Sequence, residues 1–290
     1  MTIRQVHHGL IAAAVLFASA LLSCANVEAA PPPASELVKP KLLADVSSIA
    51  SGQPFTVGVL MRLAPKWHVY WINPGDSGLV PAVEWKLPSG FSAAELQFPV
   101  PSKIDLPGGL VNYGYEDEVM LLATITPPKD LPANASVPID AKLTYLVCNQ
   151  DNCVPGDAKL HLDLQASASP VSANQQLFES SRAKLPAPAM RSPVFTATPQ
   201  GQGVAATFTL TDPNVKDARA WFAAPGDNLI VKDIKIDPLP SLQTRVSFTV
   251  EPLAGQKIPD EISFPSVLSY SDNGQSRGIS VPVRLNLKAS

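Results

Sequence analysis

Cys148 and Cys153 are the residues of this chain whose type and spacing most clearly predict chemistry. The chain has 3 cysteines in 290 residues, and the third, Cys24, lies in an amino-terminal segment typical of export signals. Two cysteines separated by four residues, in a protein that leaves the cytoplasm, meet an oxidising compartment and can form a disulfide with each other.

This disulfide could be a structural staple or a redox-active pair. On the loop-closure model, so short a loop removes only about 2 kcal/mol of unfolded-chain entropy. A chain of this length buries a full core without that help. Short or exposed disulfides tend to be the reducible ones. The spacing alone therefore leaves both interpretations open.

Residues 1–29 have the pattern of a signal peptide. A weakly basic start precedes a run of apolar and small residues from 10 to 22, which is too short to span a bilayer. Small residues favour cleavage before Ala30, whereas Leu21-Leu22-Ser23-Cys24 resembles a lipobox that would make Cys24 a lipidated first residue. We favour plain cleavage, and expect a membrane contact only if Cys24 is lipidated.

Composition favours β structure and argues against several functions. The 30 prolines and 16 glycines are spread along the chain as turn punctuation. A net charge of −3 without a basic cluster argues against nucleic acid as a partner. Catalytic triads, phosphate loops, zinc spacings and Met-rich or His-rich tracts do not stand out. We therefore predict neither a cofactor nor a metal site.

Several segments alternate apolar and polar residues with the period of a half-buried strand. Such runs, separated by turn residues, are typical of antiparallel β-sandwiches. The alternating apolar positions fall within Phe55–Leu63, Leu160–Leu164, Val204–Leu210, Val246–Val250 and Val281–Leu287. The sequence therefore predicts an all-β fold.

One segment breaks this rhythm and divides the chain. Residues 172–184 begin with a serine suited to capping, contain good helix formers and end with basic residues, and three prolines follow. We predict a first sandwich over residues 31–168, a helical linker over 169–189 and a second sandwich over 190–290. The alternative is a helix packed within a single domain.

Three separated motifs resemble the amino-terminal periplasmic domain of the DsbD family. They are Trp67–Gly78 (WHVYWINPGDSG), Val111–Val119 (VNYGYEDEV) and Cys148–Gly156 (CNQDNCVPG). The closer likeness is to the branch that includes the copper-sensitivity suppressor protein ScsB. The resemblance covers roughly residues 40–165, implies an immunoglobulin-like fold, and implies that a second sandwich follows.

The resemblance also implies a redox function. In this family the domain receives electrons from a thioredoxin-like domain through a membrane-embedded one, and passes them to periplasmic thiol proteins. By resemblance, Cys153 would form the mixed disulfide and Cys148 would resolve it. The sequence shows no Cys-x-x-Cys and no membrane domain. The expected partners are thus a separate membrane or thioredoxin-like electron-transfer protein and periplasmic thiol proteins. The chain would be one component of a protein-disulfide reductase system in the periplasm.

Residues around the cysteines have simpler interpretations. Asp151 lies between them, and no Lys or Arg falls within five residues on either side. A nearby carboxylate disfavours thiolate, so the sequence does not predict a strongly acidified thiol. In the family an aromatic cap loop shields the pair. The matching stretch, Asp105–Asn112, has no aromatic residue, which leaves Tyr113 and Tyr115 as candidates for that role.

The aromatic cluster at the start of the first motif is best explained by packing. Trp67, His68, Tyr70 and Trp71 follow a predicted strand, and core or rim packing accounts for them better than a metal site, because His68 has no second histidine nearby. A competing hypothesis for the whole chain is a non-catalytic binding module whose disulfide is inert.

Overall fold

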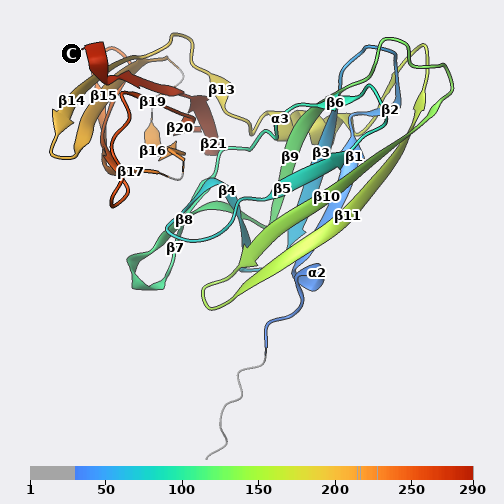
Figure 1. Ribbon diagram of the computed structural model, residues 1–290, viewed down its shortest axis with the longest axis horizontal. Helices are drawn as coiled ribbons and strands as arrows, with labels where there is room; N and C mark the ends of the chain where they lie inside the picture. The colour runs from blue at the N-terminus through green and yellow to red at the C-terminus, as the bar shows by residue number, and fades with distance from the viewer. Residues whose placement is uncertain (1–29, 214, 216, 227, 290) are drawn as a thin grey trace, which may run out of the picture. The chain divides into compact units, whose positions relative to one another are not determined.

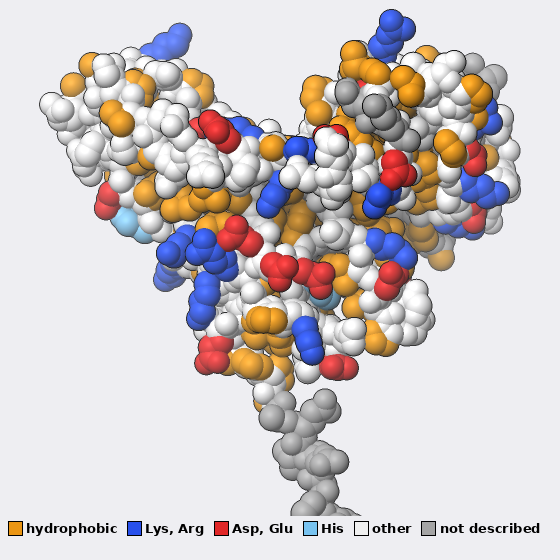
Figure 2. Space-filling model, turned by 180° about the vertical axis from the view of Figure 1, so that it is seen from behind, with side chains coloured by type: hydrophobic (Ala, Val, Ile, Leu, Met, Phe, Trp, Pro, Cys, Tyr) orange, Lys and Arg blue, Asp and Glu red, His pale blue; other side chains and the backbone are white. Residues whose placement is uncertain are grey.

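The computed structural model describes residues 30–213, 215, 217–226 and 228–289, and most of these lie in β-strands. Cys24 and the predicted signal peptide, residues 1–29, lie outside the described residues. No described helix is long and apolar enough to cross a membrane. Charged side chains of both signs are spread over the face shown in Figure 2.

The first half of the chain contains two facing sheets (Figure 1). One is antiparallel, in the order β1 (Val38–Ala44), β3 (Phe55–Leu63), β9 (Glu118–Thr126) and β6 (Ser92–Ala93). The other runs β12 (Val171–Ser172), β2 (Val46–Ile49), β11 (Cys153–Ala166), β10 (Ser136–Cys148), β4 (His68–Gly75), β8 (Val111–Glu116) and β7 (Ser102–Asp105), with β5 (Ala82–Lys86) also paired to β10.

The first core lies between these two sheets. Alternation along β3 turns Val57, Val59 and Met61 inward, and alternation along β10 does the same for Ile139 and Leu143. All five side chains are buried. The period-two pattern in the sequence therefore predicts the core face of β3 correctly. Short segments complete this half: α2 (Ala34–Leu37) before β1, and the 3-10 turn η1 (Pro107–Gly109) before β8.

A short helix, α3 (Gln175–Arg182), covers the outer face of β3 and β9. Its Phe178 is fully buried against Leu60 and Leu122, so these strands bury both of their faces. The helix is shorter than the sequence predicts, and the expectation of a serine cap at Ser172 is wrong. Ser172 instead pairs with β2, in strand β12, and Asn174 precedes the helix.

The second half surrounds its own core with three sheets. Their orders are β13 (Ala187–Pro188), β21 (Gln275–Ser280), β20 (Ser266–Asp272), β16 (Ala218–Ala223); β14 (Val194–Gln200), β15 (Gly203–Thr211), β18 (Gln243–Pro252), β17 (Leu229–Leu239); and β19 (Glu261–Phe264) with β22 (Val283–Asn286). The 3-10 turn η2 (Leu287–Ala289) follows β22. Aromatic rings fill this core: the centroid of Trp221 lies 4.4 Å from that of Phe248 and 5.9 Å from that of Phe208.

The predicted fold class is confirmed: the chain is all-β, with two immunoglobulin-like, mainly antiparallel sandwiches joined by a segment that contains a short helix. Side chains from both halves also meet. Phe222 of β16 packs its ring against Trp71 and Tyr113 of the first half. The division into a domain over 31–168, a linker over 169–189 and a domain over 190–290 stays a prediction.

Candidate functional site

The cysteine pair closes the end of a long β-hairpin. Strands β10 and β11 pair without a register shift from Ser136 opposite Gln165 to Cys148 opposite Cys153, and they run side by side in Figure 1. The two cysteines form a disulfide with an S–S distance of 2.06 Å, and their Cα atoms lie 4.1 Å apart. Because the ladder fixes which residues face each other, the hairpin itself brings the sulfur atoms together.

Asn149 organises the loop between the cysteines. Its side-chain oxygen accepts hydrogen bonds from the backbone N–H groups of Asp151 at 2.9 Å and Asn152 at 2.7 Å. Its own backbone N–H donates to the carbonyl of Asn152. An asparagine that bonds the backbone two and three residues ahead makes a tight turn without help from distant residues. The loop geometry is therefore encoded locally.

The two cysteines differ in their exposure to solvent. Cys148 is 1% exposed, whereas Cys153, at the start of β11, is exposed. An incoming thiolate must reach the sulfur that it attacks. The structure therefore leaves Cys153 open to solvent and keeps Cys148 buried behind it.

Cys148 lies on the outer face of its sheet, in one row with two other residues. It is the register partner of His68 in β4, and His68 is the partner of Glu116 in β8. Side chains of directly opposed residues point to the same face, with Cβ atoms about 4.5–5.5 Å apart. The neighbours Val69 and Val147 point to the other face, into the core. His68 therefore stands beside Cys148, on the side away from Cys153.

His68 and Tyr70 are buried polar side chains on this outer face. Their rings meet edge to face, with centroids 5.2 Å apart. Burial lowers the pKa of His68 below its usual 6.5 and raises the pKa of Tyr70 to about 12. A Cβ at Gly78 would come within 2.2 Å of the Tyr70 ring, so the segment after β4 covers it closely. Among the described residues, His68 Nε2 and Tyr70 Oη are buried atoms without a hydrogen-bond partner.

A groove of about 520 Å³ opens next to the disulfide loop. Both basic and acidic groups line it, and Lys103 Nζ lies 2.6 Å from Asp105 Oδ1. Its walls include Lys66, His68, Lys103, Asp105, Glu116 and the hairpin residues Asn149, Gln150 and Asp151. In the part of the chain that the structure describes, no group of three or more His, Cys, Asp or Glu side chains could hold a metal ion.

The candidates for shielding the pair do not shield it. Tyr115 points into the core, where its hydroxyl donates to the Pro99 carbonyl at 2.7 Å. Tyr113 lies on the same face and packs against Phe222. The expectation that these tyrosines cap the cysteines is wrong, because alternation along β8 turns them away from the face that holds Cys148.

The other aromatic residues behave as the sequence predicts, except that His68 gains a neighbour. Trp67 and Trp71 are buried in the first core, and Tyr70 is buried on the outer face. The pairing of His68 with Cys148 was not predicted from the sequence. The alternation of His68 and Tyr70 with Val69 and Trp71 shows that the first two share a face, but only the register of β4 against β10 places Cys148 there.

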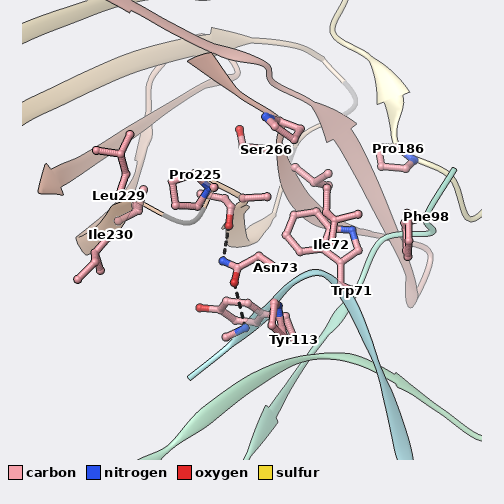
Figure 3. A pocket seen from close by; sticks show the side chains of 18 of the residues that line it. Trp71, Ile72, Asn73, Phe98, Tyr113, Pro186, Pro225, Leu229, Ile230 and Ser266 are labelled. Carbon is pink, nitrogen blue, oxygen red and sulfur yellow. Dashed lines mark hydrogen bonds between the residues drawn. The ribbon is translucent and has the colours of Figure 1, made fainter. Parts of the chain in front are cut away.

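A second cavity, larger than the groove, lies elsewhere and has a structural explanation. It measures about 910 Å³, and neither cysteine lines it. Figure 3 shows that its walls come from β4 and β8 on one side and from the segments around Pro225, Leu229 and Ser266 on the other. The Asn73 amide donates a hydrogen bond to the carbonyl of Ala223 across it. This space lies where the two halves of the chain touch, and it is separate from the disulfide.

Comparisons with known proteins point to one family. Residues 34–165 match the family model described as the N-terminal part of the thiol:disulfide interchange protein DsbD. The search of curated proteins returns no match. Among solved structures, the chain is similar to the N-terminal periplasmic domain of ScsB from Proteus mirabilis, with a TM-score of 0.62, 20% identity, and coverage of 88% of this chain and 96% of that one. At that identity the likeness shows the fold alone.

A second solved structure is much less similar. The major pilin subunit BcpA of Bacillus cereus aligns with a TM-score of 0.27 and 10% identity, over 86% of this chain and 66% of that one. Likeness at this level supports no argument about function.

Proposed function

Because residues 34–165 form a DsbD N-terminal-like domain, we propose that this chain is a periplasmic thiol–disulfide exchange protein that works through Cys148 and Cys153. The observation that carries the proposal is the asymmetry of the pair. An exposed Cys153 and a buried Cys148 are held opposite each other by the hairpin. One sulfur is open to attack, and the other is protected and within reach of it.

The exchange reaction follows from this asymmetry. A partner thiolate attacks Cys153 Sγ, the bond between the two cysteines breaks, and its electron pair leaves on Cys148 Sγ. The second thiol of the partner then attacks the partner's own sulfur in the mixed disulfide and releases Cys153 as a thiolate. The partner leaves with a disulfide, and this chain keeps two electrons as a dithiol. The same steps in reverse pass those electrons to an oxidised substrate.

We propose that the electron donor is a separate membrane or thioredoxin-like protein and that the recipients are periplasmic thiol proteins. This part of the proposal is supported by the family match. The groove beside the loop carries charges of both signs. Such a surface favours partners with a matching mixture of charges rather than strongly acidic or basic ones.

Thiol trapping in cells tests the proposal. A Cys148→Ser variant should accumulate a mixed disulfide through Cys153, visible as a band of higher mass that disappears with reductant. Cys153→Ser should trap much less, because the remaining Cys148 thiol is buried. The double serine variant is the matched control for bands that do not involve these sulfurs.

Two results would contradict the proposal. Equal trapping by both single variants would contradict the roles assigned to the two cysteines. No adduct from either variant, together with a wild-type pair that stays oxidised in cells, would overturn the exchange function and favour a non-catalytic binding module.

A further inference from the structure

The imidazole of His68 is a buried polar group that the fold leaves unused. The side chain is 2% exposed, and its Nε2 has no hydrogen-bond partner among the described residues. Buried polar atoms in native proteins are nearly always paired, so an exception calls for an explanation. A partner that exists only in another state of the protein is one such explanation.

Reduction of the disulfide creates a new acceptor beside His68. The side chain is the register partner of Cys148 and lies on the same face of the sheet. A disulfide sulfur is a weak acceptor. Once the bond opens, Cys148 carries the leaving electron pair as a thiolate, and charged acceptors form much stronger hydrogen bonds than neutral ones.

We propose that neutral His68 donates a hydrogen bond to the Cys148 thiolate that forms when the disulfide opens. The inference rests on the proposed exchange function and adds a residue to it. When a partner thiolate attacks Cys153 Sγ, the S–S bond breaks and its electron pair moves to Cys148 Sγ, where the imidazole N–H stabilises the negative charge. When Cys148 attacks in the reverse step, the hydrogen bond is released. His68 neither gains nor loses a proton in this cycle.

The surroundings of His68 keep it neutral at pH 7. Burial lowers its pKa, and a neutral imidazole carries one N–H donor. The charged groups near it come from every neighbouring element: Glu116 from β8, Lys103 and Asp105 from β7, Lys66 before β4, and Asp151 from the hairpin loop. These charges are of both signs, and burial is the cause that sets the direction of the shift.

Thiol titration tests this role directly. In a Cys153→Ser background, the absorbance of the Cys148 thiolate is followed against pH, with and without His68→Phe. We expect His68→Phe to raise the pKa of Cys148, with about 10-fold less thiolate at a given pH, and reduction of the intact disulfide by dithiothreitol to slow about 10-fold, as expected for losing a hydrogen bond to a charged group. His68→Gln keeps a neutral N–H donor and should restore much of both effects.

Tyr70→Phe is the matched control. It removes the hydroxyl of the other buried, unpartnered side chain on this face and keeps the ring that contacts His68. It should leave both the titration and the reduction rate unchanged. Loss of packing alone would affect stability but would not be rescued by glutamine, so thermal unfolding of each variant separates the two causes.

The results distinguish this inference from the function on which it rests. An unchanged Cys148 titration in both His68→Phe and His68→Gln would overturn the role of His68, even where Cys148→Ser traps adducts in cells. A shifted titration in vitro, without any adduct in cells and with a wild-type pair that stays oxidised there, would keep the hydrogen bond and overturn the exchange function.

Discussion

Reduction of the Cys148–Cys153 disulfide should lower stability only slightly and should leave the fold intact. The bond closes a loop with a sequence separation of 5. On the loop-closure model a ring this small contributes about 2 kcal/mol to the free energy of unfolding. Each kcal/mol shifts the Tm of a chain of this size by roughly 2–4 °C. The expected loss is thus about 4–8 °C.

The structure supports this small value, because the hairpin does not depend on the bond. The ladder from Ser136 to Cys148 pairs β10 with β11 along its whole length, and β10 also pairs with β4 and β5. Asn149 holds the loop on its own. Removing the covalent link therefore leaves every one of these hydrogen bonds in place.

Thermal unfolding with and without a phosphine reductant measures the effect. The double Cys148→Ser, Cys153→Ser variant should unfold near the temperature of the reduced wild type and should not respond to the reductant. Loss of the native circular-dichroism spectrum on reduction at 25 °C, or a bond that resists reduction until denaturant is added, would refute the reasoning and show that the disulfide is a structural staple.

Three further predictions concern the rest of the molecule. Phe178→Ala should destabilise the first sandwich by about 3–5 kcal/mol, because the ring is fully buried between α3 and strands β3 and β9. Urea unfolding measures this loss, and a change below about 1 kcal/mol would contradict the packing of α3. Trypsin should cut first after Arg191, which is exposed between β13 and β14. If mass spectrometry finds the first cuts inside β3 or β18, that result would count against a domain boundary near Arg191. Burial lowers the pKa of His68 below its usual 6.5, so the unfolded state binds more protons than the folded state as the pH drops from about 7 to 5. The free energy of unfolding of the wild type should therefore fall over this range, and urea unfolding should show a smaller fall for His68→Phe. An equal fall in the variant would contradict the burial of a neutral imidazole.

Local patterns were enough to predict several of the strands, but they could not predict which strands pair. Alternation identified β3, β15 and β18, because alternate residues of each strand lie in a core. It could not reveal that β2 lies parallel to β11, or that Ser172 is held in β12 rather than capping a helix. These contacts join residues more than a hundred positions apart. The local pattern of residues does not show which distant segment a strand pairs with.

The same limit applies to the site. The cysteine pair and its disulfide could be predicted, since both residues lie in one short loop. The position of His68 beside Cys148 could not, because it depends on the register of two strands that are far apart in the chain. Tyr113 and Tyr115 were only candidates for the cap, because they follow the matching stretch in the sequence. The pleat of the sheet decides which face they occupy, and it turns them toward the core.

The uninterrupted register of the hairpin has a kinetic consequence. Val147 and Val154 remain paired next to the cysteines after reduction, so the two sulfur atoms stay neighbours. Their effective molarity toward each other then far exceeds the concentration of any thiol in solution. On the proposed function, a partner with one thiol attached to Cys153 is soon expelled by Cys148, whereas a partner with two thiols can complete the transfer first. The hairpin would thereby discriminate in favour of dithiol partners through competition between rates, with no need for a pocket that recognises them.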